Sequence, residues 1–191
     1  MNSEEAIALL KRTGVMREGH FKLTSGRHSD RYMQCARLFE RAEDSAEVCA
    51  AVAGFFRNAG VSLVAGPALG GILMAYEVAR ALGARNLFAE RENGKMTLRR
   101  GFQTGPGERA LVVEDVVTTG GSVREVMEVL RAAGAEVVGV GSVADRSGGE
   151  VDFGVPFHAL LSMKVESWEA GACPLCARGL PLVKPGSRPG A

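Results

Sequence analysis

The sequence predicts an α/β fold in which a parallel β-sheet is flanked by helices. Short apolar segments typical of buried strands alternate with longer segments that carry the apolar spacing of helices, and this alternation favours parallel strands joined by helical crossovers. Hydrophobic residues make up 46% of the 191 residues and charged residues 24%, which is typical of a globular chain with a real core. We therefore expect a single domain covering residues 1–191.

The first sixty residues contain two predicted helices separated by an extended segment. Residues 3–13 predict an amphipathic helix with Ser3 as its N-cap. Residues 20–35 are rich in turn-forming residues and are expected to be extended. Residues 40–59 predict a long helix that ends at Gly60, since glycine commonly follows the last turn of a helix.

The following part of the chain repeats a strand–turn–helix unit. The predicted strands cover residues 61–65, 86–89, 110–114 and 136–144, and the predicted helices cover residues 71–83 and 121–133. Residues 184–191 are rich in proline and glycine and are expected to form a frayed tail. Ligands of parallel sheets bind at the carboxyl ends of the strands, so the strand-to-helix turns are the places to search for a site.

Charge and cysteine content narrow the classes of function. A net charge of +1 argues against a broad nucleic-acid surface, so a bound anion has to be held by a local site. No apolar run approaches the roughly 18 residues of a membrane span, and the acidic N-terminal residues predict no targeting segment. Four unevenly spaced cysteines suit a reducing compartment, which leads us to expect a cytoplasmic protein.

The most specific feature is the segment 111–122, in which an apolar strand runs into two carboxylates and then into hydroxyls and glycines. Backbone N–H groups and hydroxyls at the start of a helix suit a phosphate dianion, and glycines let the backbone approach it closely. The carboxylates of Glu114 and Asp115 could accept hydrogen bonds from ribose hydroxyls. The alternative is a simple helix N-cap beside two solvated acids, but residues at the end of a buried strand are normally apolar.

This segment resembles the signature of type I phosphoribosyltransferases, and about 12 residues match it without a gap. The resemblance implies that Glu114 and Asp115 bind the ribose of 5-phosphoribosyl 1-diphosphate and that residues 118–122 bind its 5′-phosphate. The full set of residues expected to bind this substrate on the segment is Glu114, Asp115, Val116, Val117, Thr118, Thr119, Gly120, Gly121 and Ser122. The family's fold is a parallel sheet flanked by helices with a small hood, here expected from about residues 1–36 and 147–183.

The turn 66–71 is similar to the pyrophosphate loop of the family. Its glycines could bring backbone N–H groups to an anion at a helix start, although a tight turn that only serves packing would look the same. Many orotate enzymes have a lysine in this turn, whereas this chain has Leu69-Gly70. The charge of the pyrophosphate must therefore be met by another segment.

The polar stretch 90–101 carries four cations, has glycine hinges at Gly94 and Gly101, and resembles the catalytic loop of orotate phosphoribosyltransferases. In that family an arginine and a lysine close over the substrate from the neighbouring subunit. The resemblance implies that Arg91 and Lys95 bind the diphosphate and that they act with Asp115 as the catalytic residues. It also implies a homodimer whose subunits share this loop.

Two further segments fit the recognition of orotate. Residues 20–27 are similar to the Phe-x-Leu-x-Ser-Gly segment that covers the base in the orotate branch. Arg146, at a predicted strand end, matches the arginine that contacts orotate, although an ion pair with Asp145 or Glu150 is the alternative. The residues expected to bind orotate are Thr118, Arg146, Lys22 and Ser25.

The resemblance, which covers about residues 15–165, implies an enzyme of pyrimidine synthesis. The expected reaction converts orotate and phosphoribosyl diphosphate into orotidine 5′-phosphate and pyrophosphate. The expected cofactor is Mg²⁺, bound mainly through substrate oxygens and water, with no protein residue as a metal ligand. Two alternatives stay open: a transferase of the same fold for a purine or uracil, and a ligand-sensing regulator that binds nucleic acid.

Two other patterns in the sequence are weaker evidence for a function. The segment 139–144 matches the dinucleotide fingerprint Gly-x-Gly-x-x-Ala, but it lies within a predicted strand and no helix follows, so we reject dinucleotide binding. Cys173 and Cys176 form one Cys-x-x-Cys pair, and a zinc site would need two more ligands, which another subunit could supply. We favour plain buried thiols over zinc. Nothing in the sequence requires His20 or His28 as a base.

Overall fold

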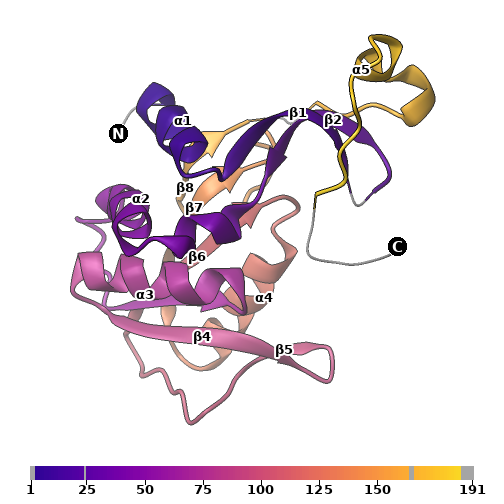
Figure 1. Cartoon of the computed structure of the whole chain (residues 1–191). Helices are drawn as coiled ribbons and strands as arrows, with labels where there is room; N and C mark the ends of the chain where they lie inside the picture. The colour runs from indigo at the N-terminus through magenta and orange to yellow at the C-terminus, as the bar shows by residue number, and fades with distance from the viewer. Residues whose placement is uncertain (1–2, 24, 164–165, 186–191) are drawn as a thin grey trace.

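The computed structural model describes residues 3–23, 25–163 and 166–185 and is built around a six-stranded sheet (Figure 1). The strand order is β5-β4-β3-β6-β7-β8, and every neighbouring pair is parallel except β4 and β5. The strands are β3 (Leu63–Pro67), β4 (Arg85–Glu92), β5 (Lys95–Leu98), β6 (Arg109–Val117), β7 (Glu136–Asp145) and β8 (Phe157–Ser162). This architecture confirms the expected α/β class.

Helices cover both faces of the sheet (Figure 1). α1 (Ser3–Arg12), α2 (Ala42–Gly54) and α3 (Gly70–Leu82) lie on one face, and α4 (Gly121–Ala132) lies on the other. Alternate residues of the central strand β6 enter the two cores, Leu111 and Val113 on the side of α2 and α3, and Ala110 and Val112 on the side of α4. Burial on both faces explains the continuous apolar run of this strand.

A second, antiparallel layer lies beyond the end of the sheet. It contains the hairpin of β1 (Met16–Lys22) and β2 (His28–Met33) together with residues 166–185, which include η2 (Ala170–Ala172) and α5 (Pro174–Ala177). The hairpin and the C-terminal segment are joined by backbone hydrogen bonds, from Lys22 N–H to the Val183 carbonyl at 2.9 Å and between His28 and Trp168 in both directions. We call these residues the hood layer.

The hood layer contains fewer residues of the C-terminal part of the chain than the sequence predicts. β8 lies within residues 147–183, yet it pairs in parallel with β7 as the edge strand of the central sheet. Its apolar side chains Leu160 and Leu161 are buried in the core, which is why this segment joins the sheet. Within the described part of residues 147–183, only residues 166–183 belong to the hood layer.

The predicted helix 40–59 is also shorter in the structure. A 3₁₀ helix, η1 (Cys35–Glu40), ends at Arg41, whose extended backbone separates it from α2. After α2, residues 55–60 form turns that bring Phe56 into the core. A methyl group on Gly139 would lie 2.5 Å from the Phe56 ring, and one on Gly141 would lie 3.2 Å from it. These two glycines, which mimic a dinucleotide motif, therefore make room for an aromatic ring.

The polar stretch 90–101, expected as a hinged loop, is mostly a β-hairpin. β4 continues to Glu92, turns at Asn93 and Gly94, and returns as β5. Asn93 and Gly94 both have a positive φ, 51° and 81°, which suits the tight turn of a two-residue hairpin. Among the helices of the described residues, none is long and apolar enough to cross a membrane.

Candidate functional site

The predicted phosphate turn, residues 118–122, lies between β6 and α4. β6 is longer than expected and contains both carboxylates before it ends at Val117. A cavity of about 70 Å³ is lined by Glu114 and by every residue from Val116 to Val123. The backbone thus encloses a small polar space at a helix N-terminus, where the helix dipole and free N–H groups favour an anion.

Gly120 is the residue that the turn requires. Its φ of +75° lies in the left-handed region, where a side chain is strained. A methyl group on Gly120 would also lie 2.8 Å from the ring of Phe153, which is buried behind the turn. The glycine therefore permits both the bend and the close packing of the turn.

Burial makes ionisation of the two adjacent carboxyl groups unfavourable. Burial raises the pKa of Glu114 to about 8, and the nearby charge of Asp115 adds to this effect. Burial also raises the pKa of Asp115, although the N–H of Val116 donates a 2.8 Å hydrogen bond to its Oδ1. A pair of adjacent carboxyls that resists ionisation is common at functional sites, because a cation or hydroxyl donors from a ligand can relieve it.

The turn 66–71 brings a second backbone segment to Asp115. α3 begins at Gly70, and a methyl group there would lie 2.8 Å from Asp115 Oδ2. Only a glycine allows this approach of the helix start to the carboxylate. The turn itself contains no cation, and the side chain of Leu69 is 84% exposed.

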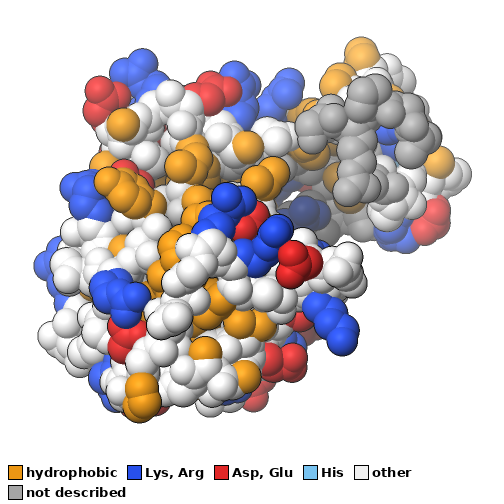
Figure 2. Space-filling model, turned by 90° about the horizontal axis from the view of Figure 1, so that it is seen from below, with side chains coloured by type: hydrophobic (Ala, Val, Ile, Leu, Met, Phe, Trp, Pro, Cys, Tyr) orange, Lys and Arg blue, Asp and Glu red, His pale blue; other side chains and the backbone are white. Residues whose placement is uncertain are grey.

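A pocket of about 210 Å³ lies between the hood layer and the end of β7. It is lined by Leu23, Ser25, Arg31, Tyr32, Met33, Arg146 and Pro185. Two of the predicted orotate residues, Ser25 and Arg146, are therefore brought together although they are far apart in the sequence. We call this space the hood pocket. Figure 2 shows a hollow between the larger lobe and the smaller lobe that carries the hood layer.

Arg146 is available for a ligand. Its Nε is buried and has no hydrogen-bond partner among the described residues. Asp145, one of its alternative partners, accepts hydrogen bonds instead from Ser147, Gly149 and Ser162. An unpartnered buried guanidinium nitrogen is rare, and it suits a ligand that brings its own acceptor.

The hood pocket and the phosphate turn are neighbours. The N–H of Arg146 donates a 2.8 Å hydrogen bond to the carbonyl of Val117, the last residue of β6. Cys35 lies near both the acid pair and the hood pocket, since the charges of Asp115 and Arg146 both act on its thiol. Burial raises the pKa of that thiol well above its usual value. A ligand could therefore span the turn, the acid pair and the hood pocket.

The remaining predicted residues are placed differently. Thr118 is exposed and lines the cavity of the phosphate turn, but not the hood pocket. The side chain of Lys22 is exposed and lines neither space, while its backbone pairs with His28 and Val183 inside the hood layer. Arg31 and Tyr32 line the hood pocket and were missed, since a strand pattern does not show which face meets a ligand.

The hairpin 85–98 holds the two cations expected to be catalytic. Arg91 forms an ion pair with Glu125 of α4 at 2.7 Å. Lys95 is exposed and pairs across the turn with Glu92 in the strand register. Neither side chain lines the two cavities of the site.

Comparison with known proteins identifies the family of the chain. The family model of the phosphoribosyl transferase domain matches residues 39–169. The orotate phosphoribosyltransferase of Desulforamulus reducens is 57% identical over 188 residues, which cover 98% of each chain. The chain belongs to the orotate phosphoribosyltransferase family. Another member, from Thermotoga petrophila, is 58% identical over 180 residues, which cover 94% of this chain and 96% of that one.

A solved structure of the family shares the fold. The orotate phosphoribosyltransferase of Aeropyrum pernix matches with a TM-score of 0.64 and 30% identity, covering 82% of this chain and 93% of its own. The chain therefore combines a turn suited to a phosphate, an acid pair suited to a ribose and a pocket with a guanidinium nitrogen that has no partner within the described part of the chain.

Proposed function

We propose that this chain transfers the phosphoribosyl group of 5-phosphoribosyl 1-diphosphate to orotate, giving orotidine 5′-phosphate and pyrophosphate in pyrimidine nucleotide synthesis. The observation that carries the proposal is the continuity of the phosphate turn, the acid pair and the hood pocket around the ends of β6 and β7. A ribose phosphate joined to a carboxylated base has its charged groups at the two ends of such a site.

The phosphate turn binds the 5′-phosphate through the N–H groups and hydroxyls of residues 118–122. Glu114 and Asp115 accept hydrogen bonds from the ribose hydroxyls in their ionised form. During the reaction the bond from C1 to the pyrophosphate oxygen breaks, a bond from C1 to the base nitrogen forms, and the proton of that nitrogen is released to solvent. Because the sugar gains positive charge as pyrophosphate leaves, nearby carboxylates also stabilise the transition state.

Mg²⁺ is the proposed cofactor, carried mainly by oxygens of the diphosphate substrate and water. Two adjacent carboxyls whose pKa values are raised fit a site that receives a cation together with its substrate. When bound, Mg²⁺ supplies positive charge that offsets the charge of the diphosphate. The chain contributes the acid pair and the glycine backbone at Gly70, which leaves room beside Asp115.

The hood pocket binds orotate. The guanidinium of Arg146 has a buried Nε without a partner among the described residues, and it pairs with the orotate carboxylate or carbonyl. Ser25 lines the same pocket and offers a hydroxyl. A base without a carboxylate would leave the guanidinium without an ionic partner, which disfavours uracil and purines.

The proposed assembly is a cytoplasmic homodimer in which each subunit lends the hairpin 85–98 to the other. Leu69, Leu73 and Tyr76 are exposed by 84%, 52% and 56% and follow one another at helical spacing at the start of α3. Such an exposed apolar stripe favours contact with a second subunit. Lys95 is exposed and free to reach a neighbouring site, where it and Arg91 meet the charge of leaving pyrophosphate.

The test is a spectrophotometric assay of orotate consumption with phosphoribosyl diphosphate and Mg²⁺, beside uracil, adenine and hypoxanthine. Conversion of orotate alone supports the proposal, and conversion of another base in its place overturns it. Filter binding at low salt tests the regulator alternative, because specific retention of nucleic acid without orotate turnover would favour that function. The net charge of +1 and the mixture of charge signs on the face in Figure 2 give no broad basic surface there.

A further inference from the structure

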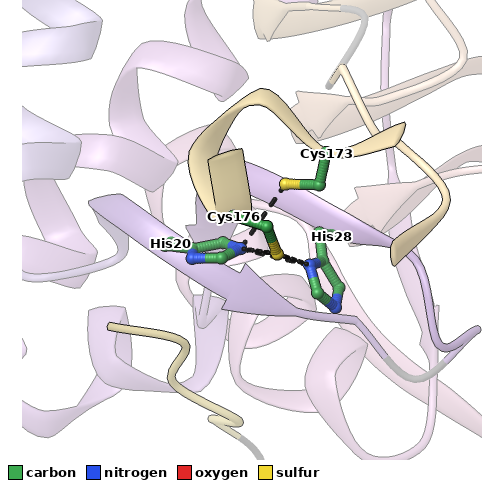
Figure 3. Close-up of side chains that lie close together, drawn as sticks. All are labelled: His20, His28, Cys173 and Cys176. Atoms are coloured by element: carbon green, nitrogen blue, oxygen red, sulfur yellow. Dashed lines mark hydrogen bonds between the residues drawn. The ribbon is translucent and has the colours of Figure 1, made fainter. Parts of the chain in front are cut away.

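Four side chains that can bind a metal converge in the hood layer (Figure 3). His20 lies on β1, and His28 is the first residue of β2. Cys173 directly precedes α5, and Cys176 lies within it. One ligand atom from each residue lies within 4.8 Å of all the others. The cysteines that the sequence analysis treated as plain thiols therefore share one space with two histidines of the same chain, and Cys176 is exposed rather than buried.

Four of the six distances between the ligand atoms are close to those around a tetrahedral zinc ion. With Zn–S bonds of about 2.3 Å and Zn–N bonds of about 2.0 Å, tetrahedral ligand atoms lie about 3.3–3.8 Å apart. The Nε2 of His20 lies 3.1 Å from the Nδ1 of His28 and 3.5 Å and 3.7 Å from the sulfurs of Cys173 and Cys176. The Cys176 sulfur lies 3.2 Å from the Nδ1 of His28.

Hydrogen bonding alone does not explain this arrangement. The Nδ1 of His20 lies 2.8 Å from the carbonyl oxygen of Leu180, which can only accept, so Nδ1 carries the proton. A neutral His20 ring then has a single lone pair on Nε2. Two sulfurs and a second imidazole nitrogen all approach that nitrogen, although one in-plane lone pair accepts one hydrogen bond well. A cation at the centre would use the lone pairs of all four atoms at once.

The supporting contacts are also those of a metal site. The hydrogen bond from His20 to the Leu180 carbonyl fixes the ring orientation and its tautomer, as the outer partners of zinc-bound histidines do. His20 and His28 are each 4% exposed and lie on paired strands, so their positions are rigid. The partly exposed Cys176 leaves a route by which an ion can enter.

We propose that His20, His28, Cys173 and Cys176 bind one structural Zn²⁺. Two thiolates and two imidazoles are a preferred zinc set, and Cys-x-x-Cys is a usual spacing for one half of it. Four protein ligands leave no open position, so the ion has a structural role rather than a catalytic one. The ion would join the β1–β2 hairpin to the C-terminal segment of the chain.

This joint lies beside the hood pocket. His20 and His28 stand at the two ends of the segment that contains Leu23 and Ser25, both of which line the pocket. On the C-terminal side, Val183 bonds to His20 and Lys22, and Pro185 lines the pocket two residues later. Zinc therefore fixes the part of the hood pocket's wall that comes from the hairpin and the C-terminal segment.

The test is the zinc content of the untagged full-length chain, measured by mass spectrometry after excess zinc is removed. We expect about one zinc ion per chain in the native protein and in Cys49→Ala, and less than about one tenth in Cys176→Ser. Cys49 is a matched control because it is a free, fully buried cysteine in α2, outside the cluster. Equal zinc contents in the two variants, or none in the native protein, would overturn the proposal.

A second measurement covers the case in which Cys176→Ser does not fold. Co²⁺ is titrated into the native chain after removal of metal, and the expected result is the absorption of tetrahedral Co²⁺ with thiolate charge-transfer bands, lost on addition of Zn²⁺. The absence of these bands would refute the site. A thiol assay that finds two free thiols instead of four in the purified protein, because Cys173 and Cys176 form a disulfide, would also refute it. These readouts do not depend on the proposed transferase activity.

Discussion

Replacement of Gly70 by alanine tests the geometry that joins the turn 66–71 to the acid pair. The added methyl carbon would lie 2.8 Å from Oδ2 of Asp115, 2.9 Å from its Cγ and 3.1 Å from its Oδ1. Because non-bonded carbon contacts are normally about 3.5 Å or longer, the carboxylate has to move by roughly 0.5–1 Å. That movement strains or breaks the 2.8 Å hydrogen bond from the Val116 N–H.

The effect is expected in catalysis more than in stability. Gly70 is the first residue of α3 and has no positive φ, so alanine is compatible with its backbone. Alanine also favours a helix over glycine by up to about 1 kcal/mol, which offsets part of the strain. A displacement of about 1 Å in a positioned group can cost on the order of 10²-fold in rate, so we expect kcat/KM for phosphoribosyl diphosphate to fall by roughly 10- to 100-fold.

The assay is initial-rate kinetics with phosphoribosyl diphosphate varied at saturating orotate, together with thermal unfolding. Gly54→Ala is the control, because no atom outside its chain neighbours and the backbone of its own helix lies within 4 Å of its added methyl group, and the residue lies at the end of α2. The control should keep native kinetics. Native kcat/KM in Gly70→Ala would refute the argument that this glycine sets the position of Asp115.

Three other predictions follow from the site. Glu114→Gln should raise the melting temperature at pH 8–9 but not near pH 5. The pKa of Glu114 is about 8 in the folded chain and 4.5 ordinarily, so the stability of the native protein falls as pH rises from about 4.5 to about 8. Glutamine does not ionise and therefore removes this loss of stability. A difference that is flat between pH 5 and 9 would contradict the raised pKa. Arg146→Ala should raise KM for orotate about tenfold or more, with little change in KM for phosphoribosyl diphosphate, and equal effects would indicate a structural role. Lys95→Ala should lower kcat on the order of 10²-fold, and mixing it with Asp115→Asn should restore activity if subunits share the hairpin; no recovery despite proven subunit exchange would exclude sharing.

The phosphate turn could be predicted from the sequence because its parts are contiguous. The strand, the two acids, the hydroxyls and the glycines follow one another between Leu111 and Ser122, so local pattern and local geometry coincide. The predicted strand, residues 110–114, is shorter than β6, which continues to Val117. Carboxylates are unusual inside a buried strand, so Glu114 and Asp115 indicated its end.

The hood could be predicted only in outline, because it depends on contacts between distant segments. Nothing local shows that His20 and Cys173 meet, or that Arg31 faces the same pocket as Arg146. The stretch 90–101 was expected as a loop because its charges and glycines suggest one. Residues 95–98 form a strand because they pair with β4 at the edge of the sheet, and this pairing cannot be seen in the local sequence.

The central claim is that the acid pair and the phosphate turn bind phosphoribosyl diphosphate. Calorimetric titration of this substrate with Mg²⁺ into the native chain and into Asp115→Asn tests it most directly, since asparagine keeps the shape of the side chain and removes its charge. Because a hydrogen bond to a charged group contributes about 1.5–3 kcal/mol, the account predicts a dissociation constant at least about tenfold higher in the variant, with an unchanged fold by circular dichroism. Equal dissociation constants in the two proteins would contradict it.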